Sequence, residues 1–232
     1  PADSDLLPPE QNLEGFWSLT KHEDIRYASR HPEIFSSAQG MTLGLRPDPD
    51  RPNPLVQITP FIAMDPPEHT AQRKTVRSVS APSNLRNLEP LIRERTVAVL
   101  DSLPEGETFD WVDTVSIELT TLLLATLFDF PLEDRRKLTR WSDIVFAVPG
   151  SGGVVETQQQ KIEELMGCVT YFEGLWEERR GGDGTDLVSM LANGEATKDM
   201  PTISHLGNLL LLIVGGNDTT RNTMTGSVYG LN

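Results

Sequence analysis

The chain has 232 residues, of which 38% are hydrophobic and 23% are charged, an ordinary composition for a globular protein. Its 20 basic and 34 acidic residues give a net charge of −14, which argues against a general nucleic-acid-binding role. No apolar run reaches the roughly 18 residues of a membrane span, and the N-terminus lacks the pattern of a secretion signal. The single cysteine, Cys168, excludes an internal disulfide and fits a reducing cytoplasm, where we expect this protein to reside.

The hydrophobic pattern predicts a mainly α-helical chain with a small β element near its start. Residues 15–20 alternate between apolar and polar and predict a short strand, which a helix over about 21–30 follows. Residues 37–63 are rich in Pro, Gly and Asp and predict a long loop, the kind that forms lids or binding loops. Further helices are expected over 86–102, 112–129, 133–147, 156–180, 185–192 and 202–229, the last being apolar on nearly every face of its first half and therefore central.

The segment MDPPEHTAQRKTV, residues 64–76, contains a helix start. Asp65 stands where an N-cap belongs, and Pro66 follows at the first helical position. His69 and Arg73 are four residues apart and so share a face, where their donors suit a carboxylate or a phosphate. The alternative is a solvated basic face. The chain has only four histidines and none pairs with another at ligand spacing, so no metal site is predicted.

The segment LLIVGGNDTTRN, residues 211–222, places two glycines inside an apolar helix. Each glycine costs roughly 1 kcal/mol relative to alanine in a helix, so either the helix ends at Gly215 or the space is used. If the helix continues, the missing side chains of Gly215 and Gly216 open a groove for a flat prosthetic group or a small ligand. Thr219 can then bond back to the carbonyl of residue 215, and Asp218 could pass protons to its hydroxyl. In the alternative, Asp218 or its neighbour caps a second helix.

These two motifs, in this order and about 150 residues apart, resemble the N-terminal half of a bacterial cytochrome P-450, a haem-thiolate monooxygenase. The resemblance covers nearly all of residues 1–232 and implies the B to I helices of that fold. It implies that His69 and Arg73 bind the propionates of haem b and that the two glycines let the helix pass close over the haem. It also implies that Thr219 and Asp218 deliver protons on the oxygen-binding side.

The segments LGNLLLLIVGGNDTTRN and FIAMDPPEHTAQRKTV are more similar still to the alkane-hydroxylase branch of that family. This implies terminal (omega) hydroxylation of medium-chain alkanes or fatty acids, with electrons passing from NADH through a ferredoxin reductase and a ferredoxin. The basic residues of the segment after Asp65 would face the ferredoxin, and residues 38–63 and 133–165 would form the substrate entrance. Helical spacing from Gly216 suggests three pocket contacts: Leu209, Leu212 and Ile213.

The second half of the family pattern is absent from this chain. The axial cysteine loop is expected beyond Asn232, and Cys168 lies in an amphipathic helix typical of a core cysteine. We therefore expect a fragment that is inactive alone and exposes apolar surface. Two alternatives stay open: a monooxygenase for another apolar substrate, such as a terpene or a steroid, and a non-catalytic helical module.

Overall fold

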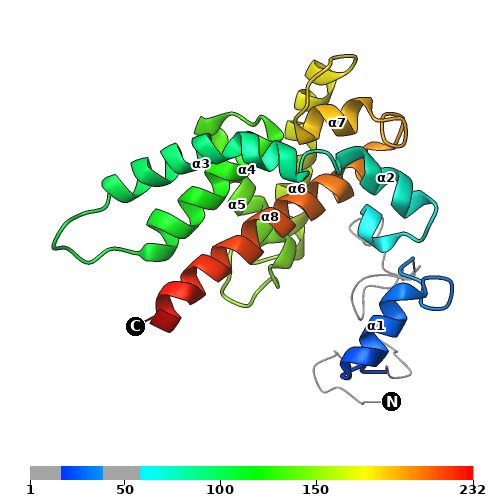
Figure 1. Cartoon of the computed structure of the whole chain (residues 1–232), viewed down its shortest axis with the longest axis horizontal. Helices are drawn as coiled ribbons and strands as arrows, with labels where there is room; N and C mark the ends of the chain where they lie inside the picture. Colours follow the sequence, from blue (N-terminus) through cyan, green and yellow to red (C-terminus); the bar gives the residue numbers. More distant parts are fainter. Residues whose placement is uncertain (1–16, 39–57, 232) are drawn as a thin grey trace.

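The computed structural model describes residues 17–38 and 58–231, and these residues are mainly helical. The longest helix, α8, runs from the neighbourhood of α2 and α7 to the C-terminal end of the chain (Figure 1). It packs against η3, α4, α5 and α6, so it is central, as its apolar sequence predicts. The bounds are α1 His22–Arg30, η2 Phe61–Ala63, α2 Glu68–Val76, α3 Pro82–Asp101, η3 Val112–Ile117, α4 Glu118–Phe128, η4 Leu132–Asp134, α5 Arg136–Phe146, α6 Gln158–Arg179, α7 Leu187–Asn193 and α8 Thr202–Leu231.

The core lies where α4, α5 and α6 meet α8. An aromatic cluster joins the end of α4 to α5 and α6, with ring centroids 5.0–6.2 Å apart; its members are Phe128, Phe130, Trp141, Tyr171 and Phe172. Cys168 of α6 is fully buried in the same core, and burial raises the pKa of its thiol. The prediction that Cys168 is a packing residue is confirmed.

Local signals position the helices around this core. Thr157 caps α6 by accepting the Gln160 N–H at 3.0 Å, and Asp186 caps α7 by accepting the Ser189 N–H at 2.9 Å. The expected helices from residue 86 onward are all present, with ends that differ by a few residues. The helix predicted over 112–129 begins with a π-helical turn, η3, before it becomes α4.

The strand predicted over 15–20 is wrong for its described part. Residues 17–20 are not in a strand, and the described ranges hold no other strand with which they could pair. Residues 15 and 16 lie outside the described residues, as does most of the predicted loop over 37–63, namely 39–57. The end of that loop forms the short helix η2, which the sequence analysis did not predict.

The predicted N-cap at Asp65 is also wrong. The Asp65 carboxylate accepts hydrogen bonds from Ser36 Oγ at 2.5 Å and from the Ser37 N–H at 2.8 Å instead of capping α2, which begins at Glu68. These two bonds, the Ser36 bond first, hold the pKa of Asp65 below its usual value. Asp65 thus joins the segment after α1 to the start of α2.

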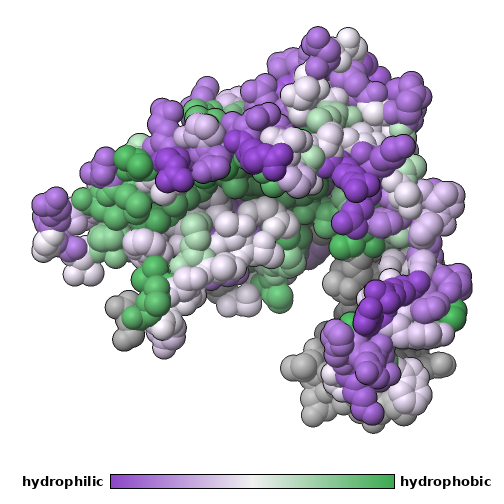
Figure 2. Space-filling model, viewed as in Figure 1, coloured by the Kyte–Doolittle hydropathy of each residue, from purple (hydrophilic) through white to green (hydrophobic). Residues whose placement is uncertain are grey.

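Several large apolar side chains are exposed. Figure 2 shows apolar residues over α3 and α4 and at the C-terminal end of α8. Tyr229 and Leu231 in that end are each 88% exposed. None of the described helices combines the length and the apolar character that crossing a membrane requires.

Candidate functional site

Helix α8 continues through the glycine pair, from Thr202 to Leu231. The alternative that Gly215 ends one helix is therefore wrong. The Thr219 hydroxyl donates a hydrogen bond to the carbonyl oxygen of Gly215 at 2.7 Å, as helical spacing predicts. One turn of α8 thus carries an exposed glycine and an exposed hydroxyl on the same face.

The two glycines face different surroundings. A Cβ atom added at Gly215 would meet no atom within 4 Å, whereas one added at Gly216 would lie 2.5 Å from Cδ2 of Leu124. Gly216 therefore lets α4 approach α8 closely, and the open notch on α8 consists of Gly215 and Thr219. A role for Gly216 at a cofactor stays a prediction.

The Asp218 carboxylate is directed toward α5. Its Oδ1 accepts hydrogen bonds from Arg221 at 2.7 Å and from Ser142 Oγ at 3.3 Å, and Arg221 also donates to Asp143 at 3.0 Å. Asp218 forms no hydrogen bond with Thr219, so its predicted transfer of a proton to that hydroxyl needs a rotation or a bridging water. Sequence analysis missed Arg221, although its spacing of three residues from Asp218 was an available signal.

Asn217, between these residues, is fully buried and faces α4. Its Oδ1 accepts a hydrogen bond from Thr120 Oγ1 at 3.1 Å, while its Nδ2 has no partner within the described part of the chain. Asn217 therefore contacts α4, Asp218 contacts α5, and Thr219 lies in the open notch.

The two predicted donors of α2 lie on a short helix, next to its buried residues Gln72 and Val76. His69 is half-buried, with its ring centroid 6.3 Å from that of Phe61, and Arg73 is exposed. Across residues 17–38 and 58–231, neither side chain forms a hydrogen bond or an ion pair. Their donors are therefore free for an anionic group.

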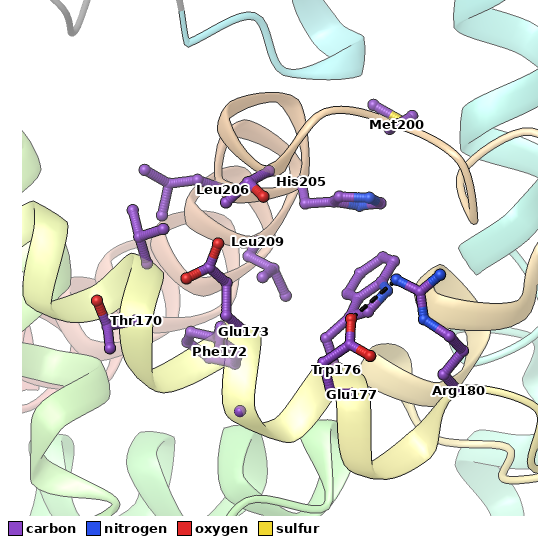
Figure 3. A pocket seen from close by; sticks show the side chains of 13 residues that line it. Thr170, Phe172, Glu173, Trp176, Glu177, Arg180, Met200, His205, Leu206 and Leu209 are labelled. Carbon is purple, nitrogen blue, oxygen red and sulfur yellow. Dashed lines mark hydrogen bonds and ion pairs between the residues drawn. The ribbon is translucent and has the colours of Figure 1, made fainter.

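The three predicted pocket residues do not share one surface. Ile213 is fully buried in the core and Leu212 is half-buried against it. Leu209 lines a groove of about 470 Å³ between α6 and α8, and Gly215 is not part of that groove (Figure 3). The pocket assignment stays a prediction. Leu211, one turn before Gly215, is also half-buried.

Figure 3 shows aromatic rings together with the charged side chains of Glu173, Glu177 and Arg180 around the groove. The Trp176 and His205 rings lie 3.7 Å apart between centroids, and burial lowers the pKa of His205. Glu177 at the rim is paired with Arg180 at 2.9 Å.

No protein-family model matches the chain, but individual proteins do. Linalool 8-monooxygenase of Pseudomonas putida is 33% identical, over 96% of this chain and 56% of that protein. The methyl-branched lipid omega-hydroxylase of Mycobacterium bovis is 27% identical, over 94% of this chain and 50% of that protein. The structure of cytochrome P450-153 from Novosphingobium aromaticivorans superposes with a TM-score of 0.80 at 42% identity, over 93% of this chain and 53% of that one.

The chain belongs to the cytochrome P450 family. It spans about half the length of the curated relatives that it matches. The expected fold, the helical N-terminal portion of a cytochrome P450, is confirmed over the described residues.

Cytochromes P450 are haem-thiolate proteins, and the residues of α2 and α8 fit a haem. The flat macrocycle needs a helix surface without side chains, and at Gly215 an added Cβ would meet nothing. The propionates need donors that no protein group has engaged, and His69 and Arg73 provide them. Cys168 does not fit the axial thiolate, because it is fully buried inside the α6 core.

Proposed function

We propose that this chain forms the oxygen-binding side of a haem-dependent monooxygenase that hydroxylates the terminal methyl group of medium-chain alkanes or fatty acids. The observation that carries the proposal is the notch of Gly215 and Thr219 on a continuous α8, in a chain 42% identical to cytochrome P450-153. The axial cysteine then belongs to the part of the family fold that this chain does not span. We place the protein in the cytoplasm.

Haem b, when bound, supplies the iron centre at which dioxygen is activated. His69 and Arg73 would hold its propionates through charge-assisted hydrogen bonds. The Thr219 hydroxyl donates to the Gly215 carbonyl at 2.7 Å, so its oxygen lone pairs are free to accept a proton donor in the notch. Asp218, between Arg221 and Ser142, would move protons from the α5 side toward Thr219.

An apolar substrate needs apolar walls and no polar partner. Leu211 and Leu212 stand one turn before Gly215, and both are half-buried. Phe146 at the end of α5 and Val148 just after it are exposed, and both lie within the predicted entrance over 133–165. These apolar surfaces support a hydrocarbon substrate.

Electrons would come from NADH through a ferredoxin reductase and a ferredoxin. Arg73, Lys74 and Arg77 are exposed on α2 and just after it, although the chain as a whole carries a net charge of −14. A local basic surface on an acidic protein favours an acidic partner and speeds its encounter.

The test uses the full-length protein that contains this chain. A reduced carbon monoxide difference spectrum reports the thiolate-ligated haem, and an octane titration reports the substrate through the spin state. A thiolate band that shifts with octane supports the proposal. A well-folded protein without haem would overturn it and favour the helical-module alternative.

Linalool is the second ligand in this titration, because the 33% identity with linalool 8-monooxygenase favours a terpene as the next candidate. A response to linalool and none to octane or a fatty acid would retain the monooxygenase and replace its substrate. A matched Thr219→Ala variant should keep the carbon monoxide band and form less alcohol per NADH consumed. An unchanged ratio would remove Thr219 from the proton path.

A further inference from the structure

Asn208 is a fully buried amide within the apolar run of α8. A buried amide without hydrogen-bond partners destabilises the fold, so the partners of Asn208 indicate its structural role. Its Oδ1 accepts the Phe61 N–H at 2.8 Å, and its Nδ2 donates to Oε1 of Gln72 at 2.9 Å. One side chain therefore fastens both η2 and α2 to α8.

Gly207, the residue before Asn208, lets the segment before η2 approach α8 closely. A Cβ atom at Gly207 would lie 2.9 Å from the backbone nitrogen of Pro60 and 3.1 Å from Ile58 and Thr59. The main chain of residues 59 and 60 and the side chain of Ile58 therefore lie directly against α8. We call Gly207 and Asn208 the 207–208 seat.

The seat connects the two halves of the candidate site. Gln72 and Val76 form the buried face of α2, and residues 69 and 73 project from the same helix. Gly215 lies two helical turns after Gly207, or about 12 Å along α8. Any shift of α2 on the seat would therefore change the distance between the α2 donors and the notch.

We propose that Asn208 is a positioning residue that sets the separation between the propionate donors His69 and Arg73 and the notch at Gly215. The proposal rests on the proposed function. The bond to Gln72 holds α2 itself, and the bond to Phe61 holds η2, which residues 64–67 join to α2. The start of α2 is therefore tied to α8 both directly and through the segment before it, whereas one apolar contact would leave α2 free to slide. Gly207 contributes because it has no side chain that would push residues 58–60 away from α8.

The experiment compares Asn208→Leu with wild type in the full-length haem protein. Leucine is nearly isosteric with asparagine but makes neither hydrogen bond. We expect amide hydrogen exchange to rise in residues 58–76 and haem transfer to apomyoglobin to accelerate by about tenfold, the scale on which outer-shell partners act on a metal centre. Gln72→Leu cuts one of the two bonds from the other helix and should give a smaller increase in both.

The matched control is Thr120→Val, which is also isosteric. It removes a buried bond between α4 and α8, at Asn217, and leaves the seat intact. We expect Thr120→Val to lower the melting temperature without faster exchange in residues 58–76 and without faster haem transfer. If Asn208→Leu does not fold, Gly207→Ala tests the same contact by adding bulk.

Equal effects of Asn208→Leu and Thr120→Val on exchange in residues 58–76 and on haem transfer would overturn the positioning role and leave a core amide only. A wild-type protein that takes up no haem is a different result. It rejects the proposed function before any variant is made. The two failures are therefore distinguishable.

Discussion

Arg221 holds two carboxylates from different helices, Asp218 on α8 and Asp143 on α5. The Arg221 side chain is 15% exposed, and those of Asp218 and Asp143 are 19% and 30% exposed. Arg221→Met should therefore lower the free energy of unfolding by about 1–3 kcal/mol, because it leaves partly desolvated charges without a cation. Urea denaturation at neutral pH measures this loss.

Arg221→Lys is the control for that change. It keeps the charge but not the fork that reaches both carboxylates, so it should recover part of the stability. If Arg221→Met and wild type unfold at the same urea concentration, the network contributes no net stability.

The hydrogen bonds that Asp65 accepts predict that low pH weakens the contact between Asp65 and the segment after α1. The hydrogen bonds from Ser36 and Ser37 lower the pKa of Asp65 in the folded state. Their contribution to stability is therefore fully present above the pKa of the unfolded chain, which is near 3.8. It is lost as the pH falls through the lower folded pKa. Protection of the Ser37 amide against hydrogen exchange should therefore decrease below about pH 4.

Asp65→Asn is the control variant for the acid effect. It should show weak protection of Ser37 at every pH, because the amide does not titrate. Protection that falls equally with acid in both proteins would point to another group.

The residues that sequence alone located are those whose partners are close in sequence. The bond from Thr219 to Gly215 follows from helical spacing. The burial of Cys168 follows from the apolar pattern of its own helix. Asn208 was missed because its partners, Phe61 and Gln72, lie 147 and 136 residues away. A polar residue within a run of leucines was the available signal.

At the scale of the element, the two glycines of α8 have different surroundings. Gly216 lies against Leu124, whereas Gly215 has no neighbour within 4 Å of an added Cβ. Gly216→Ala should destabilise the protein by about 1 kcal/mol, because overpacking against Leu124 outweighs the gain in helix propensity. Thermal unfolding of the variant measures the balance. Leu124→Val in the same background should restore part of the loss.

Gly215→Ala is the matched substitution one residue earlier. The added Cβ meets no protein atom, so the apoprotein should become more stable by up to about 1 kcal/mol while haem uptake weakens. Loss of stability at Gly215 and not at Gly216 would reverse our assignment of the two faces.

The helices could be predicted from the sequence, whereas individual contacts between elements could not. Periodicity and breakers located every helix from α3 to α8, since both signals are local. The strand near residue 17 failed for the opposite reason, because a strand exists only with a partner. The π-helical turn η3 packs against α8 and has no local signal of its own.

At the scale of the whole molecule, the apolar surface is unevenly distributed. Tyr229 and Leu231 are almost fully exposed at the end of α8, and Trp17 is 82% exposed before α1. We predict that the isolated 232-residue chain self-associates in solution, because large exposed apolar patches drive association. Analytical ultracentrifugation over a concentration series measures it.

Substitution of Tyr229 and Leu231 by serine should shift the isolated chain toward monomer. Serine at Thr202, which is exposed but not apolar, is the control. A chain that sediments as a monomer at every concentration would show that these side chains do not form an adhesive surface.

Cys168 gives the chain a practical property. Its thiol is fully enclosed and its pKa is raised, so thiolate-directed reagents should leave it untouched in the folded state. A cysteine engineered at an exposed position of α2 or α6 would then be the one reactive thiol of this chain. Fluorophores or spin labels could follow the movement of single helices against a native background that needs no prior replacement.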